Sequence, residues 1–499
     1  MRWFHIMALS VGLFSRLWAV PQADRPNVVL ILLDDLNDWV GCMGGHPQAR
    51  TPNIDALAQR GVLFKNAHCQ APVCNPSRVS MMMGLRPSTT SVYDNDDSLQ
   101  KATILSEIPS LPEWFTHQGY LTMGCGKVFH ASRGQKRFTR YGPSGGQGPL
   151  PDQRLSTTPE ASRSKLWDWG TFPPEESQYH DVINSQWAAE QLQKDHEAPL
   201  FLTVGLYRPH VPLFAPKRFL DLYPLKDVLL PTVLEDDMED IPQGGRSLAH
   251  NPLPPAHAWF LKKNRWKEAV QAYLASVSFV DACVGRLIKS LDDGPMADHT
   301  WVVLLSDHGF FLGEKERWAK QALWERATRV PLIIVPPKSL PESSVRNSTC
   351  SAPVELLSLY PTLLDFCQLK HPPHLEGRSL MPLVQSPQRP WPYPAITTFG
   401  KGNHSIRSKR WRYTRYADQS EELYDHITDP HEWHNLAPQS EVLEQVRPTL
   451  APWLPQAHST RGCVSPSVRI ESGHLSSKAR PRERPTKGKQ IPCAFPTLR

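Results

Sequence analysis

The chain has 499 residues, of which 40% are hydrophobic and 21% are charged. This composition is typical of a soluble globular protein rather than a disordered or multi-spanning membrane protein, and the length excludes a peptide hormone or a minimal binding module. The net charge of +6 comes from residues 461–499, where nine basic side chains stand against two acidic ones. We predict a disordered basic tail over residues 461–499 and no nucleic-acid partner, with adhesion of the tail to an acidic polymer such as DNA as the alternative.

The N-terminus has the features of an export signal. Residues 1–23 contain an arginine at position 2, an apolar stretch over 6–14, and small residues at 19 and 23, which is the order of a secretory signal peptide. The apolar stretch is much shorter than the ~20 residues of a membrane span. We predict a signal peptide over residues 1–23 and an exported protein without a membrane span (periplasmic, secreted or lysosomal according to the host), with a disordered leader on a cytoplasmic protein as the alternative.

Alternating strands and helices follow along residues 24–385, which we predict to be the catalytic domain. Unbroken apolar runs predict strands buried on both faces at residues 28–33, 121–128, 201–206, 301–305 and 330–335. Helical patterns lie at residues 51–58, 179–192 and 266–291, the last with its apolar residues on one face. This alternation predicts an α/β domain with a mainly parallel central sheet flanked by helices.

Two long loops and a change of pattern complete the organisation. Residues 131–178 and 212–257 are rich in proline, glycine and charge and have no period, and loops of this length usually build a functional site. After about residue 385 the chain contains short β-like pieces and a helix near residues 440–450. We predict a smaller C-terminal α+β subdomain over residues 386–460.

The nine cysteines are too few and too dispersed for a disulfide scaffold, and no Cys-x-x-Cys pair predicts a zinc site. In an oxidising compartment some of them can pair, and Cys463 with Cys493 in the tail is one possibility. The pairing does not follow from the sequence.

Acidic residues come directly after two of the predicted strands. Asp34 and Asp35 follow residues 28–33, and Asp307 and His308 follow residues 301–305. Because the carboxyl ends of parallel strands meet at one edge of a sheet, we expect these side chains to lie together. Carboxylates at such an edge require a positive partner, and oxygen-rich ligand sets suit hard cations. We predict a site for Ca²⁺ or Mg²⁺, with a turn or helix cap as the alternative for each aspartate taken alone.

A second group of residues surrounds Cys74, in the segment Cys74-Asn75-Pro76-Ser77-Arg78. Proline is tolerated in a first helical turn and Ser77 can cap, so Cys74 is expected at a helix N-terminus, where backbone N–H groups favour an anion. Arg78, one turn later, can donate to a tetrahedral oxyanion. A buried structural cysteine is the alternative when this segment is taken alone.

The segment resembles the signature of the sulfatases, Cys-x-Pro-Ser-Arg, although Met83-Gly84 stands where that family usually has Thr-Gly. The resemblance extends over residues 25–436 and implies an alkaline-phosphatase-like fold. It also implies that a formylglycine-generating enzyme oxidises Cys74 to formylglycine during export. The metal ligands implied by the resemblance are Asp34, Asp35, Cys74, Asp307 and His308.

Further segments match catalytic positions of the family at Lys127, His130, His210 and Lys320, as in Gly-Lys-Val-Phe-His, Pro-His-x-Pro and Trp-Ala-Lys. The resemblance implies that Lys127 and Lys320, with Arg78, surround the sulfate oxygens. It further implies that His130 assists sulfate release, and that His210 and Lys320 support the departing alcohol oxygen.

The iduronate-2-sulfatases share these forms, so the implied substrate is a sulfated carbohydrate with a sulfate at the 2-position of a hexuronate. The alternatives are a phosphodiester or phosphonate monoester hydrolase of the same superfamily and a catalytically silent carbohydrate-binding homologue. Most of the tryptophans are expected in the core, although Trp167, Trp169 and Trp259 in the long loops are candidates for stacking on sugar rings.

Overall fold

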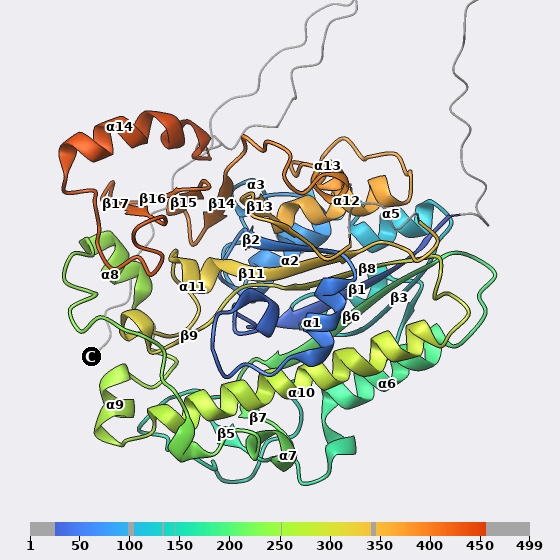
Figure 1. The fold of residues 1–499 in the computed structure, drawn as a ribbon, viewed down its shortest axis with the longest axis horizontal. Helices are drawn as coiled ribbons and strands as arrows, with labels where there is room; N and C mark the ends of the chain where they lie inside the picture. The colour runs from blue at the N-terminus through green and yellow to red at the C-terminus, as the bar shows by residue number, and fades with distance from the viewer. Residues whose placement is uncertain are drawn as a thin grey trace, which may run out of the picture. The chain divides into compact units, whose positions relative to one another are not determined.

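The structure is a computed structural model that describes residues 25–97, 104–131, 134–144, 146–250, 252–340 and 346–455 (Figure 1). The predicted signal peptide, the predicted basic tail, and the two cysteines Cys463 and Cys493 lie outside these residues. Within the described part, no helix is both long and apolar enough to cross a membrane. The seven cysteines of the described part are all free thiols, so none of the predicted disulfide pairing occurs among them.

One large sheet forms the centre of the fold, with the strand order β12-β2-β11-β8-β1-β6-β3-β4 and β13 beside β2. Its strands are β1 (Asn27–Asp34), β2 (Val62–His68), β3 (Leu121–Gly126), β4 (Arg140–Tyr141), β6 (Leu200–Pro209), β8 (Thr300–Ser306), β11 (Arg329–Val335), β12 (Ser348–Cys350) and β13 (Val354–Glu355). All five predicted strands are therefore confirmed. The sequence pattern did not reveal β2, because Lys65, Asn66 and His68 interrupt its apolar run.

The sheet is mainly parallel, as predicted, with one exception. β1 pairs in parallel with both β6 and β8, whereas β11 runs antiparallel to β8 and to β2. A parallel pair needs a crossover that returns the chain to the opposite edge. Between β8 and β11 the chain forms only the short strands β9 (Phe311–Leu312) and β10 (Trp318–Ala319) and the single-turn helix α11 (Glu325–Thr328). β11 therefore starts from the edge at which β8 ends.

Helices cover both faces of the sheet (Figure 1). Apolar side chains of α1 (Pro52–Gln59), α6 (His180–Leu192) and α10 (Trp266–Asp292) belong to the core on one face. Those of α2 (Cys74–Met83), α5 (Leu111–His117) and α12 (Leu359–Phe366) belong to the core on the other. The remaining short helices and strands are α3 (Pro87–Thr90), α4 (Ile104–Glu107), β5 (Trp169–Gly170), β7 (Leu213–Phe214), α7 (Lys217–Leu220), α8 (Gln243–Ala249), α9 (His257–Lys262) and α13 (Met381–Gln385).

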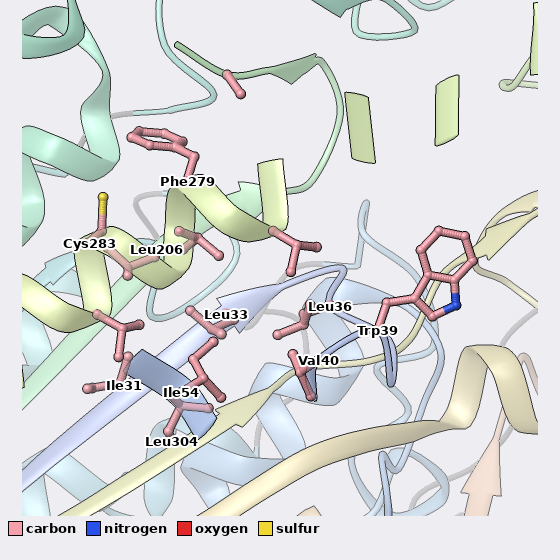
Figure 2. Close-up of a cluster of buried hydrophobic side chains, with 14 of the residues drawn as sticks. Ile31, Leu33, Leu36, Trp39, Val40, Ile54, Leu206, Phe279, Cys283 and Leu304 are labelled. Atoms are coloured by element: carbon pink, nitrogen blue, oxygen red, sulfur yellow. The ribbon is translucent and has the colours of Figure 1, made fainter. Parts of the chain in front are cut away.

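β1 is buried on both faces, which explains its continuous apolar sequence. Val29, Ile31 and Leu33 belong to the core beneath α10, whereas the alternate residues Leu30 and Leu32 belong to the core beneath α2. Figure 2 shows Ile31 and Leu33 close to Ile54 of α1, with α10 above them. Such close packing on both sides fixes the end of β1 and the acidic residues that follow it.

The prediction that Trp167 and Trp169 stack on sugar rings is wrong. Trp167 and Trp169 are each only 3% exposed and pack in the hydrophobic core. They cannot stack on a sugar in solvent, because the loop that carries them folds back against α10 and places their rings inside. Trp259 is half-buried and packs against the same core.

The predicted C-terminal α+β subdomain is present. It contains an antiparallel sheet of β14 (Ala395–Thr398), β15 (His404–Arg407), β16 (Trp411–Arg415) and β17 (Glu421–Asp425), and the helix α14 (Ser440–Leu450). Leu443, Val446 and Leu450 of α14 form a hydrophobic cluster with Ile406 and Tyr413 of the sheet.

Candidate active site

The predicted metal ligands meet at the carboxyl edge of the sheet. Leu33 and Ser306 are paired in register, so Asp34-Asp35 and Asp307-His308 continue side by side from β1 and β8. All four side chains are completely buried. Asp35 has a φ of 66°, and its backbone N–H donates to Asp307 Oδ1 at 3.3 Å. The parallel pairing of β1 with β8, in a sheet predicted to be mainly parallel, brings these residues together at one edge, as expected.

Cys74 is the first residue of α2, as predicted, and its side chain points into this group of charges. Its Sγ lies 3.7 Å from Asp34 Oδ1, 3.3 Å from His308 Nε2 and 3.3 Å from Lys320 Nζ. The prediction that Ser77 caps the helix is wrong, because α2 has no side-chain cap. Ser77 Oγ instead donates to the backbone oxygen of Asp307 at 2.6 Å and so ties α2 to the loop after β8.

Arg78 is also completely buried, and its guanidinium contacts the predicted metal ligands. Its Nε donates to Asp307 Oδ2 at 2.8 Å, its Nη2 lies 3.6 Å from Asp34 Oδ1, and its Nη1 donates to the backbone oxygens of Lys127 and Val128. Burial alone would lower the pKa of Arg78, but Asp307 and Asp34 outweigh it and raise the pKa. The structure therefore places Arg78 as a support for two carboxylates, and its predicted contact with sulfate stays a prediction.

Two lysines reach the same carboxylates from different segments. Lys127, directly after β3, has its Nζ against Asp34 Oδ2 and 5.3 Å from the centre of the Tyr207 ring. Lys320, directly after β10, has its Nζ 2.5 Å from Asp35 Oδ1. Burial would lower the pKa of each ammonium, but the aspartates outweigh burial and raise it. Both lysines therefore remain charged beside Cys74.

The two predicted catalytic histidines, His130 and His210, are less buried than the other site residues. His210 has its Nε2 3.9 Å from Asp35 Oδ2 and its Nδ1 2.5 Å from the backbone oxygen of Val211. His130 is half-buried, its ring hydrogen-bonds to Cys74, and its Nδ1 is buried without a hydrogen-bond partner. The partly open positions of both rings let them meet a substrate.

The electrostatics of the site favour a negative charge at position 74. Burial raises the pKa of the Cys74 thiol, but Lys127, Lys320 and His308, together with the hydrogen bond from His130, outweigh burial and hold the pKa well below its usual range. Cys74 is the unmodified side chain here, and its sulfur marks the place of any nucleophile derived from it.

The residues present fit a divalent cation. Ligand atoms of Asp34, Cys74, Asp307 and His308 lie within 4.8 Å of one another, and so do those of Asp34, Asp35, Cys74 and His210. Asp35 Oδ2 is buried without a hydrogen-bond donor, and burial raises the pKa of Asp307 to about 6 in spite of Arg78. A cation would neutralise the buried carboxylates, and oxygen ligands of this kind suit Ca²⁺ or Mg²⁺.

A further cluster of possible metal ligands, Glu325, His426 and Glu432, has a different character. Arg412 pairs with both glutamates, and Arg407 Nε lies 3.1 Å from Glu325 Oε2. With two buried arginines beside the carboxylates, this cluster is an ion-pair network that joins α11 to the C-terminal sheet.

Sequence reasoning missed two residues that hold the His210 loop in place, Asp181 and Arg208. The carboxylate of Asp181, in α6, accepts the backbone N–H groups of Tyr207 at 2.6 Å and Arg208 at 2.9 Å. The Arg208 guanidinium donates to the backbone oxygens of Phe214 at 2.8 Å and His210 at 3.3 Å. Arg208 stands in the segment already identified around His210, but nothing in the sequence connects Asp181 to a loop 26 residues away.

The structure thus brings all ten predicted residues into one site. They combine a nucleophile position at a helix N-terminus, a cation site, two lysines beside the nucleophile and two histidines near solvent, which is the equipment for hydrolysing an ester of a tetrahedral oxyanion. The ten are Asp34, Asp35, Cys74, Arg78, Lys127, His130, His210, Asp307, His308 and Lys320.

Comparisons with known proteins agree with this chemistry. A family model described as Sulfatase matches residues 26–369, and one described as N-sulphoglucosamine sulphohydrolase, C-terminal, matches residues 313–458. A sulfatase of Formosa agariphila is 39% identical over 453 residues and covers 88% of each chain. Iduronate 2-sulfatase of Homo sapiens is 34% identical over 412 residues and covers 74% of each chain.

Two solved structures show the same fold at low identity. One, described as in complex with its substrate D-glucosamine-2-N,6-O-disulfate, has a TM-score of 0.66 at 21% identity and covers 86% of this chain and 99% of that chain. The other, a phosphonate monoester hydrolase of Agrobacterium radiobacter, has a TM-score of 0.66 at 20% identity and covers 85% of this chain and 93% of that chain. From the matching family model and the two relatives above 30% identity, the chain belongs to the sulfatase family and is a hydrolase of sulfate esters.

Proposed function

We propose that this sulfatase removes the 2-sulfate of a hexuronate in a sulfated carbohydrate such as a glycosaminoglycan. The observation that carries the reaction is the position of Cys74, whose Sγ lies 3.3 Å from both Lys320 Nζ and His308 Nε2 among buried carboxylates. The 34% identity to iduronate 2-sulfatase of Homo sapiens supports the choice of sugar.

The reaction needs two groups that the chain would hold. The residues that would hold a divalent cation, Ca²⁺ in preference to Mg²⁺, are Asp34, Asp35, Cys74, Asp307 and His308. The cation would supply electrostatic stabilisation of the sulfate oxygens, and formylglycine at position 74 would supply a hydrated aldehyde as the nucleophile.

Side chains of the protein stabilise charge and transfer protons during the reaction. Lys127 and Lys320, both positively charged and beside Cys74, neutralise the oxygens of the sulfate group while the ester bond breaks. His210, held by Asp181 and Arg208, donates a proton to the departing alcohol oxygen together with Lys320. His130 accepts a proton from the hydroxyl at position 74, which prepares the release of sulfate.

The proposal includes the route by which the enzyme is made. A formylglycine-generating enzyme would oxidise Cys74 while the chain is exported, under the direction of residues 1–23. Peptide mass spectrometry of the protein from its own host tests this step. An unmodified thiol at Cys74 in all molecules would refute the formylglycine mechanism and favour a silent, carbohydrate-binding protein.

A panel of sulfated disaccharides tests the substrate. The disaccharides should differ in uronate identity and in sulfate position, and the protein should release sulfate fastest from the 2-position of a hexuronate. The Cys74→Ala variant is the matched control, because it lacks the nucleophile and we expect it to keep the fold. Faster cleavage of an aryl phosphodiester or phosphonate monoester than of every sulfate ester would overturn the proposed function.

A further inference from the structure

An open cavity lies between the catalytic domain and the C-terminal subdomain. It is open to solvent and has a volume of about 140 Å³. None of the ten predicted site residues lines it, but it adjoins them. Its lining residues Asp38, Phe311 and Glu325 stand three to five positions after Asp35, His308 and Lys320 along the chain.

Figure 1 shows where this part of the molecule lies. β9 and α11, which carry two of the lining segments, stand at one end of the central sheet near β16 and β17 of the C-terminal sheet. The cavity is therefore at the carboxyl edge of β1 and β8, the edge that also carries the active site.

Two of the residues that line the cavity, His431 and Trp433, form an aromatic pair. The rings of His431 and Trp433 are stacked, with their centres 4.5 Å apart and their planes at 18°. His431 is exposed and Trp433 is half-buried. Trp433 belongs to none of the hydrophobic clusters of the described residues, so packing does not explain its position. A half-buried indole beside an exposed imidazole offers an aromatic surface of the kind that can stack on the apolar face of a sugar ring.

Several side chains that line the cavity are charged and neutralise one another. Asp38 pairs with both Arg326 and Arg329, and Lys315 Nζ lies 2.6 Å from Asp237 Oδ1. Because the charges are paired, the cavity has no excess positive charge to attract a second sulfate. Carboxylate and guanidinium groups nevertheless keep free acceptor and donor positions, which neutral hydroxyl groups can use.

One carboxylate oxygen in the cavity accepts no hydrogen bond. Glu314 Oε1 is buried and is ion-paired with Arg326 Nε at 2.9 Å, but the pair is not a hydrogen bond. This oxygen can therefore accept a hydrogen bond from a hydroxyl group of a ligand.

We propose that this cavity is a second saccharide subsite, which binds an uncharged pyranose unit of the chain that carries the sulfated unit. The pyranose ring stacks on Trp433, and one of its hydroxyl groups donates to Glu314. The inference rests on the proposed function, because it assumes that the sulfate ester belongs to an oligosaccharide.

Steady-state kinetics with a large and a small substrate tests the subsite. The variant is Trp433→Ala, and the matched control is Trp453→Ala, since Trp453 is 36% exposed in the same subdomain and does not line the cavity. The substrates are a sulfated tetrasaccharide prepared from heparan sulfate and 4-nitrophenyl sulfate, which is too small to reach beyond the active site. Trp433→Ala should raise KM for the tetrasaccharide by about three- to tenfold with kcat unchanged, and should leave both constants for 4-nitrophenyl sulfate unchanged.

Binding to the Cys74→Ala protein gives a second readout that needs no turnover. In isothermal titration with the same tetrasaccharide, the added Trp433→Ala change should weaken binding by about three- to tenfold relative to the added Trp453→Ala change. Equal affinities for the two variants, or no binding at all, would overturn the subsite. So would an equal loss of turnover of both substrates in Trp433→Ala. Failure of every sulfate ester to react would instead overturn the proposed function, and the binding comparison would still decide the subsite.

Discussion

Replacement of Arg412 by methionine should destabilise the folded protein strongly. Arg412, in β16, is completely buried and places five N–H groups on five acceptors, which is the full donor capacity of arginine. Three of the acceptors are the backbone oxygen of Leu323 at 3.0 Å, Ser405 Oγ at 2.8 Å and Thr328 Oγ1 at 3.0 Å. The other two are carboxylate oxygens of Glu325 and Glu432.

The size of the effect follows from the two carboxylates. Burial would raise the pKa of Glu432, but Arg412 and His426 outweigh it and lower the pKa to about 2. Without Arg412, His426 at 2.9 Å is the one positive partner that Glu432 keeps among the residues that the structure describes. Removal of one member of a buried ion pair costs about 3–5 kcal/mol. For the roughly 430 residues between Arg25 and Pro455, an unfolding entropy of about 2.1 cal/mol/K per residue converts this cost to a fall of about 3–6 °C in the midpoint.

Thermal unfolding at one fixed scan rate measures the effect. Arg410→Met is the matched control, because Arg410 makes the same kind of pair with Asp425 at 2.7 Å but its side chain is 52% exposed. The control should leave the midpoint unchanged. The double variant Arg412→Met/Glu432→Gln should recover part of the loss, because it removes the unpaired charge. If Arg412→Met shifts the midpoint no more than Arg410→Met, or if the double variant recovers nothing, the reasoning from buried charge is refuted.

Three further predictions concern the active site and the core. Cys74→Ala should abolish sulfate release without changing the circular dichroism spectrum, and residual turnover at the wild-type rate would rule out Cys74 as the nucleophile. Asp35→Asn should weaken Ca²⁺ binding in calorimetry by about tenfold or more, because it removes the charge of the carboxylate whose Oδ2 has no other donor; unchanged affinity would place the cation elsewhere. Asp281 caps α1 by accepting the backbone N–H of Ile54 at 2.8 Å, and burial raises its pKa to about 6. The folded state therefore binds this proton more tightly than the unfolded state, so stability falls between about pH 4 and pH 6 as pH rises, by roughly 3 kcal/mol. In urea unfolding, Asp281→Asn should flatten this dependence, and an identical slope in wild type and variant would contradict it.

Much of the fold follows from local sequence patterns. The apolar runs correspond to β1, β3, β6, β8 and β11, and the one-sided apolar pattern of residues 266–291 corresponds to α10 (Trp266–Asp292). These patterns are reliable for a physical reason. A strand buried on both faces needs apolar residues throughout, and a helix buried on one face needs them at helical spacing. The apolar pattern did not predict β2 because the strand contains polar residues. In the folded protein these residues are hydrogen-bonded, as His68 Nε2 is to Asn66 Oδ1 at 2.8 Å.

The orientation of a strand and the position of a loop residue depend on distant contacts instead. Nothing in residues 330–335 shows that β11 runs antiparallel to β8, since an apolar run has no direction. Trp167 and Trp169 stand in a long loop and were candidates for stacking on sugar rings, and only the tertiary packing shows that they belong to the core.

The sequence by itself predicted the ten site residues by two routes. Strand ends and a helix start indicated Asp34, Asp35, Cys74, Arg78, Asp307 and His308, and the resemblance to the sulfatases implied Lys127, His130, His210 and Lys320. The tertiary structure decided how their charges are balanced. It shows Arg78 bound to Asp307 and Asp34, Asp35 Oδ2 left without a donor, and His210 held by Asp181 and Arg208. These relations join segments that are far apart in the chain, and a burial cost or a pairing energy exists only after the fold has brought them within a few ångströms.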